Sequence, residues 1–296
     1  MKVAVTGATG VIGRAVVREL VERGDSVVAL SRDASKANLD VEIVEWRDPK
    51  SDPAPAAAFT DVDGVIHLLG EPLAQRWNDA AKREIHDSRA LGTRNLIAGM
   101  RSSPPAVLVS QSATGYYGPH GDEVVDESAA PGDNFEASVV VDWEAEARAA
   151  EQLGMRVVLC RTGVVLSPSG GALEKMLTPF KLGVGGPVAG GGQYLPWVHI
   201  DDVVGALLFA LDNDGAHGPI NVTAPAPVTN RDFSKALGRA LHRPVFMPVP
   251  GFAIRLLYGE MAAIVTTGVR AEPRRLQELG YAFRRPELAG ALEAAL

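Results

Sequence analysis

Three glycines near the amino terminus limit the fold of this chain more than any other feature of its sequence. Residues 3–6 form a short apolar run that is typical of a strand, and Gly7, Gly10 and Gly13 follow in the spacing G-x-x-G-x-x-G where a helical pattern begins. Glycine permits a tight turn and a close approach of the backbone. The free N–H groups and the dipole of a helix start attract a pyrophosphate.

A glycine turn that only joins a strand to a helix is the alternative explanation of this segment. The spacing, the position and the following pattern together favour a dinucleotide-binding βαβ unit instead. The residues expected to hold the dinucleotide here are Gly7, Thr9, Gly10, Val11, Ile12 and Gly13.

Short β-branched runs alternate with longer helical patterns through the first two-thirds of the chain. Repeated βα units in this order predict an α/β fold, a Rossmann-type doubly wound parallel sheet with helices on both faces. The expected strands are residues 3–6, 27–31, 42–46, 65–69, 106–110 and 156–161, and the expected helices are residues 13–23, 78–100 and 138–153.

The pattern changes after Arg161, where glycine and proline become frequent in residues 167–171 and 183–192. We expect substrate-side loops from about residue 167, with residues 183–192, Pro196 and Trp197 closing over the site. A helix at 201–211, a strand at 218–222 and a helix at 231–241 are expected to follow. The sequence predicts a nucleotide-binding domain over residues 1–222 and a small C-terminal helical domain over residues 247–296.

The end of the second strand indicates which nicotinamide cofactor fits. An acidic residue there would bind the ribose 2′-hydroxyl and repel a 2′-phosphate, but the strand ends with Ser31 and Arg32. A hydroxyl followed by a guanidinium suits a phosphate, so NADP is the expected cofactor. Asp33 keeps NAD open as the less favoured cofactor, and an exposed loop arginine without a ligand is the alternative for Arg32.

Composition excludes several classes of partner. The formal charge is −7 with a pI near 5.4, and lysine and arginine are not clustered, which argues against nucleic acid. Cys160 is the only cysteine and lies in an apolar run, so we expect a buried thiol rather than a redox or metal motif. The histidines have no metal-ligand spacing, and no metal is expected. Without an export signal or a membrane span in the sequence, we expect a cytoplasmic protein that does not enter the membrane.

Several further motifs, taken in order, resemble the extended short-chain dehydrogenase/reductases. The chain is most similar to the atypical branch described as epimerase-family proteins with a C-terminal domain of unknown function, over essentially its whole length. The matching segments beyond the glycine loop are residues 67–71, 88–89, 92–96, 110–118, 161–166, 196–202 and 279–288.

This resemblance implies further cofactor contacts. Leu68, Leu69 and Gly70 would line the middle of the cofactor, Glu84 and Arg89 would face it, and Val165 would lie near the nicotinamide. Physical chemistry supports the apolar pair packing on a ring and Arg89 stabilising a phosphate or ribose. For Glu84 the residues alone predict only a solvated helix face.

Catalysis in typical relatives needs a tyrosine, a lysine four residues later and a serine that holds the substrate. Ser112 supplies the serine, but Val139 and Trp143 stand where the tyrosine and lysine would fall, and neither can replace them. Tyr116 and Tyr117 are the candidates for a substitute phenol, although aromatic packing is the more common role at the end of a strand.

Two further acid or base candidates are given structural roles. The sequence favours a solvated or capping carboxylate for Glu144. His199 with Asp201 and Asp202 resembles a proton relay. In the extended family, however, this segment fixes a loop against the body of the fold, and we expect that structural role here.

Two functions remain open from the sequence. One is an NADP-dependent oxidoreductase or epimerase that acts on an unidentified carbonyl, hydroxyl or nucleotide-sugar compound. The other is a binding protein that senses NADP(H) without turnover, which would explain the absent tyrosine and lysine. A homodimer through residues 78–100 and 138–153 would suit the family, although the apolar residues there serve a core equally well.

Overall fold

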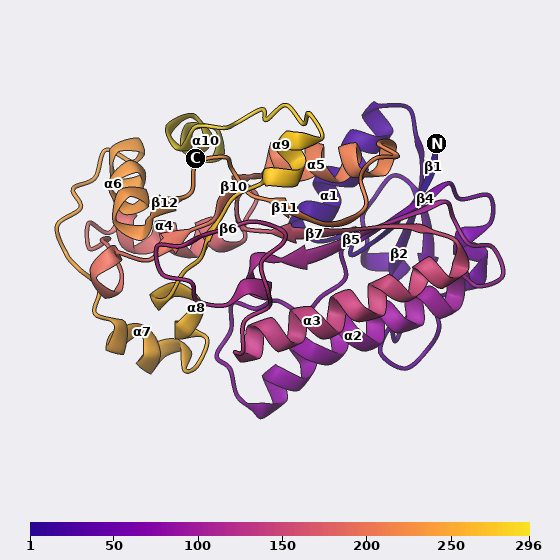
Figure 1. Ribbon diagram of the computed structural model, residues 1–296, viewed down its shortest axis with the longest axis horizontal. Coiled ribbons are helices and arrows are strands. Elements are labelled where there is room, and N and C mark those ends of the chain that lie inside the picture. The colour runs from indigo at the N-terminus through magenta and orange to yellow at the C-terminus, as the bar shows by residue number, and fades with distance from the viewer.

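The centre of the computed structural model, which describes residues 1–296, is a seven-stranded sheet (Figure 1). All neighbouring strands pair in parallel. The sheet runs in the order β3-β2-β1-β4-β5-β7-β11, so the chain reverses direction across the sheet between β1 and β4. These strands are β1 (Lys2–Thr6), β2 (Ser26–Ser31), β3 (Glu42–Glu45), β4 (Gly64–His67), β5 (Val107–Ala113), β7 (Arg156–Thr162) and β11 (Gly218–Val222).

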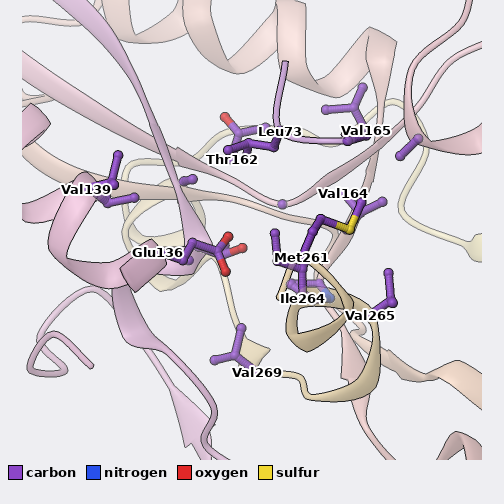
Figure 2. Close-up of a pocket in the computed structure, with 18 of the residues that line it drawn as sticks. Leu73, Glu136, Val139, Thr162, Val164, Val165, Met261, Ile264, Val265 and Val269 are labelled. Carbon is purple, nitrogen blue, oxygen red and sulfur yellow. The ribbon is translucent and has the colours of Figure 1, made fainter. Parts of the chain in front are cut away.

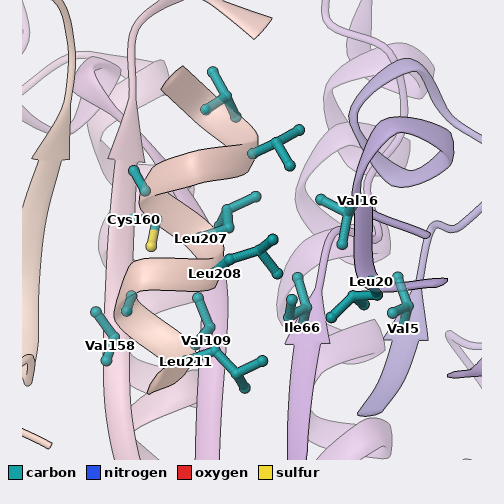
Figure 3. Close-up of a cluster of buried hydrophobic side chains, with 14 of the residues drawn as sticks. Val5, Val16, Leu20, Ile66, Val109, Val158, Cys160, Leu207, Leu208 and Leu211 are labelled. Carbon is teal, nitrogen blue, oxygen red and sulfur yellow. The ribbon is translucent and has the colours of Figure 1, made fainter. Parts of the chain in front are cut away.

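Helices cover both faces of the sheet, which confirms the doubly wound fold. Helices α1 (Val11–Glu22) and α5 (Ile200–Asp212) lie on one face, and α2 (Asp79–Met100) and α3 (Phe135–Arg148) lie on the other (Figure 1). Successive strand residues point to opposite faces, so Val3 and Val5 pack with α1 and α5 while Ala4 packs on the other side. Figure 3 shows the first of these two cores, with Cys160 buried in it as expected.

Most of the apolar side chains of α2 and α3 are buried within the chain, although Val141 is exposed. Their outer surfaces are joined by Arg94 to Glu146 and by His86 to Asp142, with His86 Nε2 3.0 Å from the Asp142 carboxylate. Nothing about these helices requires a second copy of the chain, and the homodimer stays a prediction.

Helix α3 begins earlier than the sequence-based range of residues 138–153. Asn134 caps it, because its side chain accepts the backbone N–H of Ala137 at 2.9 Å. The first turn, with Phe135 and Glu136, was missed because the apolar periodicity starts only after it. The end of the range is a 3₁₀ turn, residues Ala149–Leu153.

Most of the remaining elements gather at the end of the molecule away from the amino terminus, whereas α9 lies beside α5 (Figure 1). Three two-stranded pairs join β8 with β10, β9 with β12 and β6 with β13. The strands are β6 (Val124–Val125), β8 (Val164–Leu166), β9 (Tyr194–Leu195), β10 (Trp197–His199), β12 (Val228–Thr229) and β13 (Arg270–Ala271); the helices are α4 (Ala172–Lys181), α6 (Asn230–Ala240), α7 (Gly251–Tyr258), α8 (Ala262–Thr266), α9 (Arg274–Glu278) and α10 (Leu288–Ala295).

Residues 247–296 are mostly helical, but they have no core of their own. Met261 packs beside α2 and α3, Leu276 joins the core under α1 and α5, and Leu292 packs beneath Trp197. The segment therefore folds only against the preceding part of the chain. None of its helices, or of any other part of the chain, combines the length and the apolar character needed to cross a bilayer.

The start of α5 is capped by His199 and fastens the C-terminal segment through Asp202. His199 caps the helix by accepting the N–H of Asp201 at 3.1 Å. The buried Asp202 carboxylate accepts the backbone N–H groups of Arg284 at 2.6 Å and Arg285 at 2.9 Å. The structural role expected for this motif is thus what the geometry shows.

Replacing Asp202 by alanine should lower the free energy of unfolding by about 1–3 kcal/mol, because two backbone donors lose their acceptor. Urea unfolding measures the change. The control is Asp201→Ala, whose carboxylate is partly exposed and should contribute less than about 0.5 kcal/mol. Equal losses in the two variants would contradict the assigned role.

Candidate functional site

The predicted cofactor residues meet at one edge of the sheet. Because all strands are parallel, the loops that follow β1, β2, β4, β5 and β7 leave the sheet on the same side. Ligands of such sheets bind at this edge, where the strand order reverses. The loops bring there Gly7 to Gly13, Ser31 and Arg32, Leu68 to Gly70, Ser112 and Val165.

The backbone packing of the first loop explains two of its glycines. Gly7 has φ +63°, and a Cβ there would lie 2.5 Å from the carbonyl oxygen of Leu68. A Cβ on Gly13 would lie 2.2 Å from the Gly7 oxygen. Gly10 is exposed, and no side chain caps the start of α1 behind it. The first N–H groups of that helix are therefore available to an anion, which fits a pyrophosphate.

The loop after β2 presents a free cation. Arg32 is exposed and takes part in no hydrogen bond or ion pair. Asp33, which kept NAD open, points into its own turn: Lys36 lies 2.8 Å away and the Ser35 N–H donates to it at 3.1 Å. Lys36 and Ser35 together lower the pKa of Asp33 to about 2. A carboxylate engaged in this way favours the phosphate-binding alternative at this loop.

Arg89 supports the loop after β4. Its guanidinium lies beside Gly70 and donates to the carbonyl oxygens of Ile85 and Glu71, both at 3.0 Å. The ring centre of Trp143 is 5.2 Å from it. Burial lowers the pKa of Arg89 to about 10, yet the group stays charged at neutral pH. The guanidinium of Arg89 is thus already hydrogen-bonded to groups of the protein itself.

Glu84 lies on the surface of α2. Its carboxylate is half-exposed and pairs with Lys50, whose Nζ is 2.8 Å away. The Glu84 carboxylate therefore already has a partner within the protein. The contact with a cofactor that the resemblance implied stays a prediction.

A cavity of about 440 Å³ opens at this edge of the sheet (Figure 2). Val11 and Ile12 of the glycine loop, Ser112 and Val165 line one side of it. The wall opposite comes from the C-terminal segment, with Met261, Ile264, Val265 and Val269. Arg89 and Glu136 are the only charged side chains among its lining residues.

Ser112 stands at the edge of a buried polar network. Its hydroxyl donates to Glu144 at 2.6 Å, and Arg161 holds the same carboxylate with two hydrogen bonds of 2.8 and 2.9 Å. Burial acts to lower the pKa of Arg161, but the hydrogen bonds and charge of Glu144 raise it. Glu144 is only 4% exposed, so the solvated role expected for it is wrong. No local pattern around Glu144 indicates that an arginine on β7 lies against it.

The two tyrosines after β5 do not present a phenol to the cavity. Tyr117 is fully buried; its hydroxyl donates to Asn221 at 2.6 Å and accepts from Arg161 at 3.1 Å. Burial raises its pKa to about 12. Tyr116 stacks on Arg161, whose guanidinium carbon lies 3.4 Å from the ring centre, and neither tyrosine lines the cavity. Both tyrosines contact Arg161 in the aromatic packing that is more common at the end of a strand, and a catalytic role for them stays a prediction.

The positions of the usual tyrosine and lysine both face the cavity. Val139 is buried against Trp77, Ile85 and Met261. Trp143 is 3% exposed, and its indole N–H has no partner within the protein. Neither side chain can exchange a proton, so these positions shape the cavity instead.

Sequence reasoning missed Glu136, which lies one helical turn before Val139. It projects from the first turn of α3 toward the α8 segment (Figure 2). An acid at this position of a helix usually caps the helix in solvent, so only the tertiary structure reveals its place. Residues 183–192 were expected to close over the site, but none of them lines the cavity. They pack instead beside Val249, where the Ala189 N–H donates to its oxygen at 2.9 Å.

A glycine-rich helix start at the reversal point of a parallel sheet defines the Rossmann-type nucleotide-binding class. The family model described as the NAD dependent epimerase/dehydratase family matches residues 3–223, and a domain of unknown function, DUF1731, matches residues 249–295. The chain belongs to the NAD-dependent epimerase/dehydratase family, which confirms the resemblance found in the sequence.

Relatives match over nearly the full length. An epimerase family protein of Mycobacterium tuberculosis is 41% identical over 292 residues, which are 98% of this chain and 96% of the relative. The crystal structure of human epimerase family protein SDR39U1 (isoform 2) with NADPH has a TM-score of 0.89 and 34% identity, covering 100% of this chain and 99% of that one. A nucleoside-diphosphate sugar epimerase from Corynebacterium glutamicum has a TM-score of 0.81 and 31% identity, covering 100% of this chain and 58% of that one.

Replacing Glu144 by glutamine should lower the free energy of unfolding by about 3–5 kcal/mol, because Arg161 stays buried without its counter-charge. Thermal or urea unfolding measures the loss. Glu146→Gln, on the same helix, removes an exposed pair with Arg94 and should cost less than about 1 kcal/mol. Similar small losses in both variants would show that the buried ion pair contributes little to the free energy of unfolding.

Proposed function

We propose that the protein is an NADP(H)-dependent oxidoreductase that acts on a small carbonyl or hydroxyl compound. The cavity carries this proposal, because it connects Val11 and Ile12 of the glycine loop with Ser112 and with a wall from residues 261–269. A dinucleotide on the glycine loop and a substrate in the cavity would thus be neighbours. In this proposal residues 1–222 bind the cofactor and residues 247–296 complete the substrate side.

NADP is proposed over NAD on the chemistry of the loop after β2. Arg32 is free to hold a 2′-phosphate, and Ser31 adds a hydroxyl beside it. Asp33 is occupied by Lys36 and does not compete. The solved human relative with NADPH supports the same cofactor.

Different residues of the chain would bind different parts of the cofactor. The N–H groups at the start of α1 hold the pyrophosphate, while Leu68, Leu69 and Gly70 pack beside the cofactor and Val165 lies toward its nicotinamide. A bound NADPH supplies a hydride. The apolar walls exclude water from the reacting atoms, and Ser112 stays with Glu144 as a fixed part of the floor.

A non-catalytic NADP(H) sensor is the second candidate. Val139 and Trp143 favour it, because the usual proton-transfer pair is absent. Such a protein would bind NADPH and NADP⁺ with different affinities or change its assembly with them, and would consume neither.

The cofactor preference is tested by titrating the protein with NADPH and with NADH. We expect tighter binding of NADPH, and Arg32→Ala should weaken NADPH by about 10–100-fold, as for a lost charged hydrogen bond, while leaving NADH unchanged. Arg18→Ala, an exposed arginine on α1, is the control. Equal binding of both cofactors by the unaltered protein would contradict the assignment.

Turnover is tested by following NADPH absorbance with a panel of aldehydes, ketones and nucleotide sugars. Loss of NADPH that depends on the added compound supports the oxidoreductase. Tight binding without any loss, together with a cofactor-dependent change in assembly, would replace it by the sensor.

A further inference from the structure

The charges around the cavity limit what it can bind. Arg89 is engaged by the oxygens of Ile85 and Glu71. Glu136 is then the one charged side chain of the lining that has no partner, since it takes part in no hydrogen bond or ion pair. The remaining walls are mainly apolar (Figure 2). A substrate in the cavity would meet a single ionisable group.

The carboxyl group of Glu136 is held at a defined place. It packs on the backbone of Gly115, where a Cβ would lie 2.3 Å from Oε1. Any side chain at residue 115 would therefore displace the carboxyl group. The helix start fixed by Asn134 holds the other end of the side chain.

The surroundings of Glu136 suit proton exchange near neutral pH. Burial raises its pKa to about 7, while the positive charge of Arg89 on α2 opposes this. On the side of α7 and α8, Arg255 and Glu260 line a second hollow that Glu136 also lines, and Glu260 pairs with Lys82. A group with a pKa near the working pH is efficient both as donor and as acceptor of a proton.

Glu136 also lies between the cavity and a second hollow of about 590 Å³ beneath α7 and α8. The side chains that line both are Trp77, Asn134, Phe135, Glu136 and Ile264, of which only Glu136 is ionisable. A proton taken up on the side of Arg255 and Glu260 can thus be delivered on the other side.

We propose that Glu136 is the proton donor and acceptor of this cavity, and that the substrate is an uncharged, mainly apolar ketone, aldehyde or alcohol. The inference rests on the proposed oxidoreductase function. This proposal disfavours a nucleoside diphosphate sugar, because Arg89 is already engaged and the other charged group of the lining is a carboxyl group.

In the reduction, Glu136 acts as the acid. As the carbonyl carbon gains the hydride, the π electron pair of the C=O bond moves to oxygen, and this oxygen takes the carboxyl proton of Glu136. The Glu136 carboxylate then regains a proton from solvent through the second hollow. In the opposite direction the carboxylate would accept the hydroxyl proton while NADP⁺, the oxidant of the proposed function, would take the hydride from the carbon.

The test compares the protein with Glu136→Gln, Glu136→Asp and the control Glu146→Gln, using cyclohexanone and benzaldehyde against a UDP-4-keto sugar, which also carries a reducible carbonyl group. We expect reduction of the uncharged compounds only. Glu136→Gln should lower kcat by about 10²–10⁴-fold, the usual contribution of a positioned acid, with NADPH affinity unchanged. Glu136→Asp should restore part of the rate, and Glu146→Gln should match the unaltered protein.

A second readout does not depend on turnover. In protein labelled with ¹³C at the glutamate carboxyl groups, the resonance that disappears in Glu136→Gln should titrate near pH 7. Reduction should slow as pH rises through this value, because the acid form is lost. Titration near the ordinary glutamate value, or an undiminished rate in Glu136→Gln, overturns the role of Glu136 and leaves the oxidoreductase standing. NADPH binding without reduction of any compound overturns both.

Discussion

Arg161 and Glu144 form an ion pair in the interior, and the geometry of the site depends on it. The pair joins β7 to α3, and through hydrogen bonds of Ser112 and Tyr117 it also fixes the end of β5 and the turn that follows. Removing two charges from water is unfavourable, so the arrangement persists only because every polar group in it has a partner. The result is a rigid floor under the cavity, from which water is excluded.

The two glutamates of α3 show how environment decides the role of identical side chains. Glu144 accepts a hydrogen bond from Arg161, and this ion pair holds the interior together. Glu136, about two turns earlier on the helix, reaches an apolar cavity where its carboxyl group has no partner. Burial favours the protonated form of Glu136, although the positive charge of Arg89 opposes this. One helix thus supplies both a structural ion and a reactive acid.

The C-terminal segment completes the cavity although it lies far along the chain from the glycine loop. Asp202 holds its backbone to α5, and α8 brings Met261 and Ile264 opposite Val165. Because these residues have no core of their own, their position is determined by the surface of the nucleotide-binding part. Variation in this segment would change the shape of the cavity while leaving the cofactor loops intact.

The sequence by itself determined the doubly wound sheet and the glycine loop, and it indicated Arg32 as the candidate for binding a 2′-phosphate. These features are local: they follow from periodicity, glycine spacing and the order of residues at a strand end. The sequence also placed Val139 and Trp143 at the vacant catalytic positions, but the solvated role that it favoured for Glu144 was wrong. Only the tertiary structure decided which carboxylate meets an arginine and which faces an apolar cavity. Those outcomes depend on α3 packing against β5, β7 and α8, and no local pattern encodes such distant contacts.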